Sequence, residues 1–275
     1  MRQFYLENGS GNQYSLMDVS HWLYEPKKLG AKFNSKYEQV GSDFIRTERV
    51  TKPDDITGKV MFTSDHYNAY YDFQKFLAVE PLTFIYVSNE THKVTVDLKE
   101  IEKGEIDKDG NLVCELKLKR ISRWYKHITI YNDGNVNAGK KYTHTYPYTY
   151  TDMEPETAIV QSDSGYSSPT KLTIFGPAVN PIWTQYLNNN IVASGKVTAS
   201  IRSGRKLVVD CTTHPYSIKE YDSNNRMTND LYEASDFETA RFLFCEFGKN
   251  RIVVNHEGTN VLKVALEARL EYETV

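Results

Sequence analysis

The side chains that could carry out chemistry in this sequence are ten histidines and cysteines whose spacing fits no known reactive constellation. They are His21, His66, His92, His127, His144, His214, His256, Cys114, Cys211 and Cys245. No histidine pair has the H-E-x-x-H spacing of a helical zinc site, and no cysteine belongs to a C-x-x-C pair. The sequence also lacks a G-x-S-x-G nucleophile turn and a glycine-rich phosphate loop. It therefore predicts no catalytic residue, no cofactor or cofactor-binding residue and no metal ligand.

Two weaker arrangements also have simpler explanations. Asp54 and Asp55 are adjacent on a predicted loop, whereas a glycosidase needs two carboxyl groups roughly 5–10 Å apart across a cleft. Cys211 lies close to His214, but no third residue is placed to orient the imidazole. An odd number of cysteines, each flanked by apolar residues, indicates buried thiols and not a disulfide framework. Free thiols of this kind predict that the protein is made in a reducing cytoplasm.

Composition limits the function further. The 275 residues favour two domains, and 40% hydrophobic with 25% charged residues is ordinary for a soluble globular protein. The net charge is −3 and neither half is basic, which argues against sequence-specific nucleic-acid binding. The longest apolar runs fall far short of the roughly 20 residues of a membrane span, which predicts no membrane insertion. Residues 1–8 turn polar at once, unlike a secretion signal.

Aromatic residues are abundant, with 20 tyrosines and 12 phenylalanines. Tyrosine favours half-buried strands and is enriched in interfaces where one end of the ring is apolar and the other is wet. The composition therefore predicts a β-rich protein that assembles with partners.

The first half reads as strands around one helix. Strands are expected at 3–8, 13–19, 56–62 and 82–87, while residues 20–50 are mixed, with Gly30 and Gly41 as turn points. Apolar groups at helical spacing predict a helix over 66–79, capped by Ser64 or Asp65 and ended before Pro81. Its aromatic stripe is better explained as packing on the sheet than as a cofactor site.

A long antiparallel hairpin is predicted over 93–119. Residues alternate between apolar and polar on both sides of Asp109-Gly110, which suits a tight turn. We expect one face of this hairpin to be buried.

The best domain boundary is the small, polar segment 132–141, which divides the chain into domains 1–135 and 136–275. Directly after it, Tyr142, Tyr146, Tyr148 and Tyr150 would share one face of an edge strand interrupted by Pro147. Such a face is either a platform for sugars or a row of rings packed on a neighbouring domain or subunit. The second interpretation is favoured, because no acidic or amide partners lie nearby.

The remainder of the second half is expected to be a β-sandwich of jelly-roll type. About eight short strands are separated by turn signals, at 171–175, 182–187, 191–200, 206–211, 217–221, 240–247, 251–255 and 261–272.

The order of these features resembles the distal tail protein of long-tailed phages that infect Gram-positive bacteria. The resemblance is carried by the start at Arg2–Asn8, the strand–helix–strand unit Ile56–Val87, and the block from Leu112 to Tyr125. In the second half, Phe175–Pro181 and Leu243–Val254 continue it. It covers nearly the whole chain.

The resemblance implies a structural phage virion protein of the tail tip, a baseplate component and not an enzyme. Its fold would be mainly β with one short helix: an N-terminal belt domain that forms a hexameric ring, and a C-terminal galectin-like β-sandwich. The ring would join the tail tube protein to the tail-associated lysin or fibre protein, with a receptor-binding protein as a further candidate partner. DNA would pass through the central channel. The near-neutral charge agrees with this, because a strongly basic channel would retain phosphates.

Alternatives remain open at this point. One is a carbohydrate-binding adhesin of the tail tip that recognises host cell-wall saccharide, although no run matches a galectin's sugar-contacting H-x-N-x-R pattern. Another is a cell-wall hydrolase, for which the sequence offers no catalytic set. For the interfaces of a ring, the surroundings of the 66–79 helix and the 93–119 hairpin are the elements we would choose.

Overall fold

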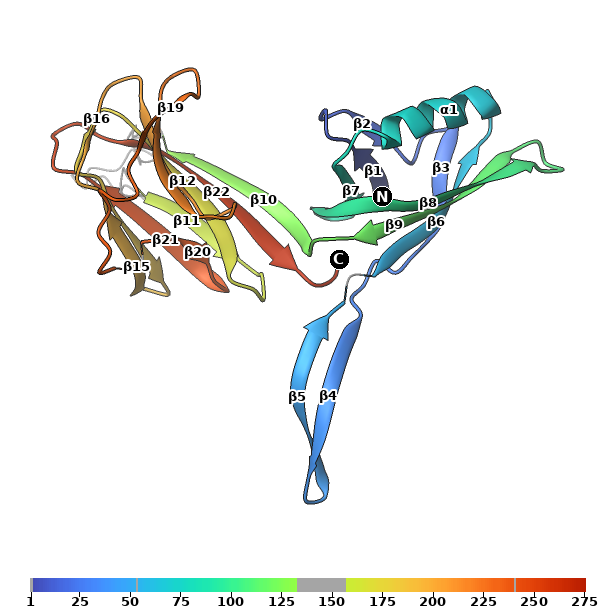
Figure 1. Cartoon of the computed structure of the whole chain (residues 1–275), viewed down its shortest axis with the longest axis horizontal. Helices are drawn as coiled ribbons and strands as arrows, with labels where there is room; N and C mark the ends of the chain where they lie inside the picture. Colours follow the sequence, from blue (N-terminus) through green and yellow to red (C-terminus); the bar gives the residue numbers. More distant parts are fainter. Residues whose placement is uncertain (1, 53, 133–156, 240) are drawn as a thin grey trace, which may run out of the picture. The chain divides into compact units, whose positions relative to one another are not determined.

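A computed structural model describes residues 2–52, 54–132, 157–239 and 241–275, which form two compact units (Figure 1). Unit 1 comprises residues 1–126 and 272–275, and unit 2 comprises residues 127–271. The chain passes from unit 1 to unit 2 after Lys126 and returns after Glu271. The predicted boundary at 135/136 and the predicted Tyr142–Tyr150 strand lie outside the described residues.

Unit 1 is built on one antiparallel sheet with the strand order β2–β1–β7–β8–β9–β6–β3. Its strands are β1 (Gln3–Glu7), β2 (Gln13–Ser15), β3 (His21–Lys27), β6 (Asp55–Phe62), β7 (Leu82–Val87), β8 (Thr91–Ile106) and β9 (Leu112–Arg120). β10 (Trp124–Asn132) pairs with β8 through Tyr125 and continues into unit 2. Alternate residues of these strands face a single core, and the largest of its fully buried side chains include Phe4, Phe62, Phe84 and Trp124.

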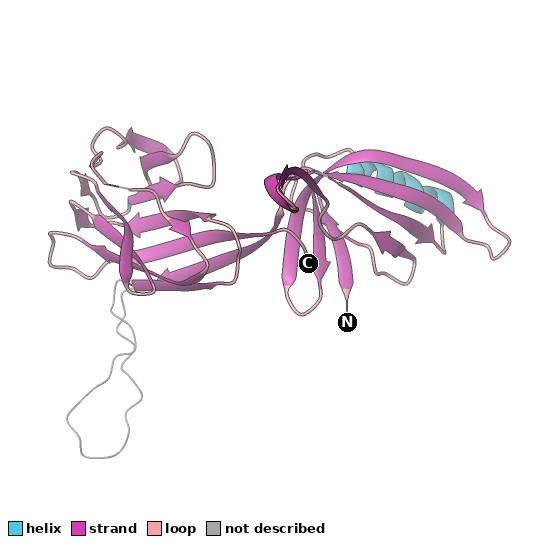
Figure 2. Cartoon of the chain, turned by 90° about the horizontal axis from the view of Figure 1, so that it is seen from below, coloured by secondary structure: helices cyan, strands magenta, loops and turns pink. Residues whose placement is uncertain are grey.

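The predicted helix is confirmed as α1 (His66–Leu77), the one α-helix of the described ranges. It lies along one face of the sheet of unit 1 (Figure 2). Tyr70, Phe73 and Leu77 are buried in the core, so the aromatic stripe packs on the sheet as expected. Asp65 occupies the N-cap position without a side-chain cap to the backbone, and its carboxylate accepts a hydrogen bond from Asn68 at 2.8 Å.

The predicted hairpin at 93–119 is also confirmed, as the β8–β9 pair. Val94, Val96, Cys114 and Leu116 are buried, as the alternation predicts. The pairing has two register shifts, between Leu98 and Glu100 and between Lys103 and Ile106, so its outer part follows the alternation less regularly.

Residues 33–51, where the sequence shows no clear pattern, form a hairpin of their own from β4 (Phe33–Val40) and β5 (Asp43–Thr51). The two strands pair with no other described strand, and almost every side chain is exposed (Figure 1). Gly41 forms its turn with φ 66°, a backbone conformation that glycine adopts without strain. Residues 20–50 are therefore more ordered than the sequence predicts.

Unit 2 has two main antiparallel sheets, which confirms the predicted sandwich. One sheet has the order β19–β18–β17–β12–β22–β10, and the other β11–β21–β14–β15. The strands are β11 (Thr157–Ser162), β12 (Ser168–Phe175), β13 (Ala178–Val179), β14 (Ile182–Leu187), β15 (Asn190–Lys196), β16 (Ser200–Ile201), β17 (Lys206–Asp210), β18 (Ser217–Tyr221), β19 (Met227–Asp230), β20 (Phe244–Cys245), β21 (Gly248–Asn255) and β22 (Lys263–Tyr272). Trp183, Leu172, Leu266 and Leu207 are among its buried residues.

Two segments of unit 2 differ from the sequence-based expectation. The strand predicted over 240–247 is reduced to β20, which pairs with the start of β12. The residues Gly248-Lys249-Asn250, predicted as a turn, instead begin β21. The buried Asn250 side chain explains this, because its amide donates to the carbonyls of Glu246 and Gly248 and so takes over hydrogen bonds that a turn would make.

Candidate interaction surfaces

Several residues that could do chemistry have neighbours of their own in the described residues. No group of three or more His, Cys, Asp or Glu side chains in the described ranges could hold a metal ion. The ring of His214 contacts the ring of Tyr216 at 4.7 Å between centroids, and the Cys211 thiol is buried. Asp55 lies 2.7 Å from the Lys99 Nζ, whose hydrogen bond holds the pKa of that carboxyl below its usual range. Within the same ranges, no helix has the length and apolar character needed to cross a membrane.

The three cysteines are buried thiols, which gives a testable expectation. Burial raises the pKa of Cys211 and of Cys245 to about 12, and it raises the pKa of Cys114 as well. Because the thiolate is the reactive form, we expect none of the three to react with a disulfide reagent in the folded protein at pH 8. All three should react in denaturant. Rapid release of one equivalent from the native protein would contradict this.

The same thiols predict a loss of stability at high pH. In the unfolded chain they ionise near 9, whereas Cys211 and Cys245 in the folded chain hold their protons to about 12. The folded state therefore binds more protons between these values, and the free energy of unfolding falls as pH rises through that range. Urea unfolding of the wild type and of a Cys211→Ala, Cys245→Ala variant at pH 8 and pH 10 measures this. The variant should show the smaller fall, and an equal fall in both proteins would contradict the assignment.

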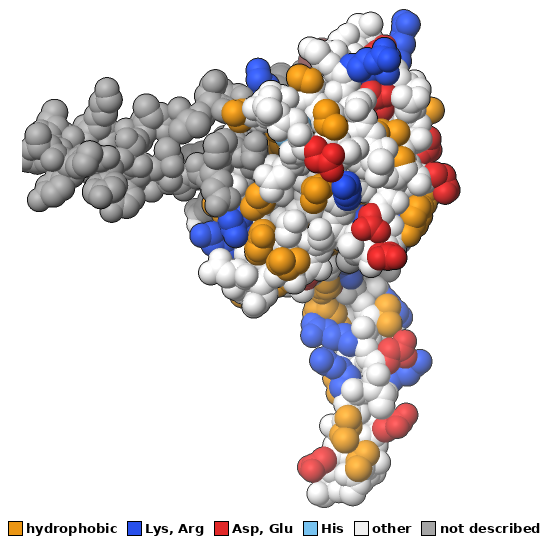
Figure 3. All heavy atoms as spheres, turned by 90° about the vertical axis from the view of Figure 1, so that its left-hand side faces the viewer, with side chains coloured by type: hydrophobic (Ala, Val, Ile, Leu, Met, Phe, Trp, Pro, Cys, Tyr) orange, Lys and Arg blue, Asp and Glu red, His pale blue; other side chains and the backbone are white. Residues whose placement is uncertain are grey.

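The first exposed surface is the hairpin β4–β5, whose two faces differ in character. Directly paired residues share a face, and the register places eight side chains on each. The side that we call the aromatic face carries Phe33, Ser35, Tyr37, Gln39, Phe44, Arg46, Arg49 and Thr51. The side that we call the acidic face carries Asn34, Lys36, Glu38, Val40, Asp43, Ile45, Glu48 and Val50. Figure 3 shows apolar, basic and acidic side chains exposed along this hairpin.

The two faces also differ in charge. The aromatic face has two arginines and no carboxylate, and the guanidinium of Arg49 lies 3.5 Å from the ring centroid of Phe33. The acidic face has three carboxylates and one lysine, Lys36, which forms an ion pair with Glu48. Phe44 is 70% exposed and Tyr37 is 58% exposed. Aromatic residues and arginine are the types enriched in protein interfaces, so the aromatic face has the composition of a contact surface.

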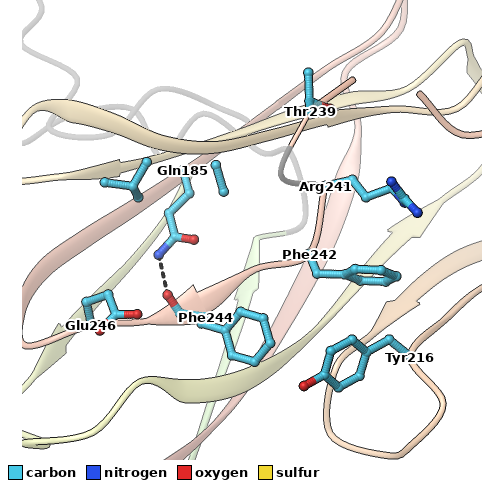
Figure 4. A pocket seen from close by; sticks show the side chains of 9 residues that line it. Gln185, Tyr216, Thr239, Arg241, Phe242, Phe244 and Glu246 are labelled. Carbon is cyan, nitrogen blue, oxygen red and sulfur yellow. Dashed lines mark hydrogen bonds between the residues drawn. The ribbon is translucent and has the colours of Figure 1, made fainter. Parts of the chain in front are cut away.

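A second exposed feature is a pocket of about 420 Å³ in unit 2, between β14, β15 and the segment that leads into β20 (Figure 4). One wall is aromatic, with the ring of Tyr216 lying 5.2 Å from Phe242 and 5.7 Å from Phe244 between centroids. The amide of Gln185 forms the floor and donates to the carbonyl oxygen of Phe244 at 2.6 Å.

Several polar groups of this pocket have partners in the protein, whereas Thr239 Oγ1 and Arg241 Nε are buried without a hydrogen-bond partner. Gln185 also donates to Asn250 at 3.0 Å, and Glu246 accepts a hydrogen bond from Ser167 at 2.6 Å. Arg241 donates to the hydroxyl of Tyr232 at 3.0 Å, and its guanidinium lies 4.3 Å from the ring centroid of Phe237. The pocket therefore combines an aromatic wall with two unpartnered polar atoms, Thr239 Oγ1 and Arg241 Nε, both of which are buried.

The two elements chosen from the sequence as interfaces contribute mainly to the core. In α1, three aromatic or aliphatic residues are buried, while Tyr67 and Tyr71 are exposed. In the β8–β9 pair, most of β8 beyond Lys99 is exposed, whereas Leu112, Cys114 and Leu116 of β9 are buried. Sequence reasoning missed the hairpin at 33–51 and the aromatic pocket. The spacing of Phe33, Ser35 and Tyr37 before Gly41 is a signal for the hairpin, whereas nothing in the sequence brings Tyr216 to Phe242.

These features define the class of the protein. It is a β-rich chain of two compact units, and its prominent exposed features in the described residues are the β4–β5 hairpin and the aromatic pocket. Residues 3–121 match the family model described as the distal tail protein, N-terminal domain. Residues 3–121 therefore resemble the N-terminal domain of distal tail proteins, and the predicted resemblance is confirmed.

Solved structures share the fold over the whole chain. One is a chain of the phage P2 baseplate in its activated conformation with Ca, with 14% sequence identity, 100% of both chains covered and a TM-score of 0.66. Another is the Dit protein of phage SPP1, described as a paradigm of the hub adsorption apparatus in phages that infect Gram-positive bacteria. It has 8% identity, 98% of this chain and 99% of that chain covered, and a TM-score of 0.62. No curated protein matches the sequence.

Proposed function

We propose that this chain is a structural component of a phage virion and forms a hexameric ring at the distal end of the tail. The observation that carries the proposal is the match of residues 3–121 to the N-terminal domain of distal tail proteins. The fold shared with a phage baseplate chain and with a hub protein supports the same role. The protein would belong to the baseplate of the mature virion and be made in the cytoplasm of the host bacterium.

The two predicted domains would divide this work. Residues 1–135 would form the ring as a belt domain, which is supported by the family match within them. Residues 136–275 would form a galectin-like domain attached to the belt, which is supported by the two-sheet sandwich of unit 2. A closed ring needs a head-to-tail interface in which each copy contributes two different surfaces.

The partners would be those of a tail hub. The ring would join the tail tube protein to the tail-associated lysin or fibre protein, and a receptor-binding protein would be a further contact. DNA would pass through the central channel without being read. A net charge of −3 supports this passage, because counterion release gives strongly basic surfaces a high affinity for phosphate backbones.

Light-scattering mass of the purified protein, with electron micrographs of the same peak, tests the proposal. One chain has a mass of 31.7 kDa. A closed ring of six would give about 190 kDa and a ring-shaped particle. A chain that stays monomeric even when its tail-tube and tail-tip neighbours are added would overturn the proposal.

The aromatic pocket of unit 2 gives the alternative, a saccharide-binding adhesin, a defined location. We nevertheless expect no saturable binding of host cell-wall saccharide at millimolar or tighter affinity in calorimetry. Sugar recognition needs several accessible polar groups to orient hydroxyls. Gln185 and Glu246 are already bonded, and the two atoms without a partner, Thr239 Oγ1 and Arg241 Nε, are buried. Binding that is lost on Tyr216→Ala and kept on Tyr221→Ala would place a sugar in this pocket and favour the adhesin.

A further inference from the structure

The aromatic face of the hairpin β4–β5 has two arginines without a carboxylate partner, and exposed rings beyond the Phe33 ring that Arg49 covers. Neither Arg46 nor Arg49 forms an ion pair with any described residue, although the lysine on the opposite face does. Phe44 and Tyr37 are exposed beside them. An isolated two-stranded hairpin is marginally stable in water, so exposed rings on such a ribbon indicate a surface that becomes buried on assembly.

A surface of complementary charge lies on the outer face of the β8–β9 pair of unit 1. Glu102 and Glu115 are directly opposite each other in the ladder, and both are exposed. Like charges in this position repel each other and destabilise the pair. Neither carboxylate forms an ion pair within the described residues.

The basic residues next to these two carboxylates are engaged elsewhere. Lys117 donates to Glu100 at 2.6 Å, and Lys59, directly opposite Glu115, lies 3.8 Å from the carboxylate of Glu25. Lys117 also attracts Glu115 and Glu102 electrostatically, so their repulsion is partly offset, but neither carboxylate forms a direct ion pair within the described residues.

Apolar side chains border the carboxylate pair on the same face of the sheet. Val113 precedes Glu115 by two residues in β9, and the register continues from Val113 to Met61 and then to Trp22. All three side chains are partly exposed. This row, Trp22–Met61–Val113, and the Glu102–Glu115 pair together form what we call the receiving surface: an apolar strip next to two unpaired negative charges.

We propose that the aromatic face of the hairpin in one copy of this chain docks on the receiving surface of the next copy. Arg46 and Arg49 would pair with Glu102 and Glu115, and the exposed rings would cover the apolar strip. This inference rests on the proposed ring, because a heterologous closed ring requires two different, complementary surfaces on each chain. Two arginines facing two carboxylates meet that requirement, and partial desolvation at an interface strengthens such pairs.

Charge reversal tests the pairing directly. Chain one carries Arg46→Glu and Arg49→Glu, and chain two carries Glu102→Arg and Glu115→Arg. Each variant alone should lose the ring, with a fall in mass of about sixfold, because every junction would join like charges. An equimolar mixture should restore the ring. In alternating copies, the glutamates on the hairpin of chain one meet the arginines on the receiving surface of chain two, and the native arginines of chain two meet the native glutamates of chain one. An even-numbered ring permits this alternation.

The mixture also distinguishes a lost interface from a misfolded chain, since misfolded variants would not restore each other. Phe44→Ser should weaken the ring, and its neighbour Ile45→Ser on the acidic face is the matched control that should leave it unchanged. If both the wild type and chain one form rings, this inference is overturned and the proposed function is retained. A wild type that forms no ring under any condition would overturn the proposed function and this interface with it.

Discussion

Replacing Trp183 by alanine is expected to lower the free energy of unfolding of unit 2 by about 3–5 kcal/mol, the range for a large aromatic side chain lost from a core. Trp183 is fully buried in β14, and its Nε1 donates to the carbonyl oxygen of Arg241 at 2.8 Å. It lies directly opposite Gly195 in the β14–β15 pair. A Cβ on Gly195 would come within 2.5 Å of the indole, so the ring packs directly on the backbone of Gly195. We expect no neighbouring side chain to fill the space that the ring would leave.

Calorimetric melting of the full chain measures this effect. Trp183→Phe is the control, because it keeps an aromatic ring against Gly195 and loses only the Nε1 hydrogen bond. It should cost clearly less than the alanine variant. A Trp183→Ala protein that melts within about a degree of the wild type would show that unit 2 does not depend on this residue.

Trp124→Ala is expected to have a similar cost in unit 1, again about 3–5 kcal/mol. Trp124 is fully buried, contacts the ring of Phe84 at 6.2 Å between centroids, and donates from Nε1 to the carbonyl oxygen of Leu29 at 3.0 Å. Its removal leaves a cavity and also a carbonyl without its donor, both of which destabilise a core.

The two tryptophan variants together separate the roles of the units. If the ring is built by the belt domain, Trp124→Ala should lower the ring's melting temperature or abolish the ring. Trp183→Ala should leave the ring intact at temperatures where unit 2 has already melted. Light scattering during the temperature ramp records both. A ring that disassembles together with unit 2 in the Trp183→Ala protein would contradict the division of labour.

The sequence predicts best those elements whose faces differ sharply in burial. In β8–β9, Val94, Val96, Cys114 and Leu116 alternate with polar residues because one face meets the core and the other meets water. In α1, the aromatic stripe faces the sheet and has helical spacing for the same reason. Periodicity records a one-sided environment, and both of these elements have one.

The hairpin β4–β5 escapes sequence analysis because it has no buried side. Apolar residues lie on both faces, and a register shift after Lys36 places Arg46 and Arg49, three residues apart, on the same face. A strict period of two therefore fails across β5. The surface that carries the interface proposal is thus the segment in which the sequence pattern is weakest.

A buried polar residue explains why the predicted turn at Gly248-Lys249-Asn250 is the start of β21. Asn250 follows glycine and lysine in a pattern typical of a turn, yet its side chain is buried and bonded to Gln185, Glu246 and Gly248. Nothing local in the sequence reveals partners such as Gln185, which is 65 residues away.

The return of residues 272–275 to unit 1 makes unit 2 an inserted domain and not an appended one. Glu273 accepts a hydrogen bond from Thr51 at 2.8 Å and lies 3.6 Å from Arg123, so the returning segment is fastened to unit 1. Both ends of the insertion are therefore anchored in the same scaffold, and a load on unit 2 would be shared by two covalent links. It also follows that unit 2 could be replaced as a whole, with the segments of unit 1 on either side of it left intact.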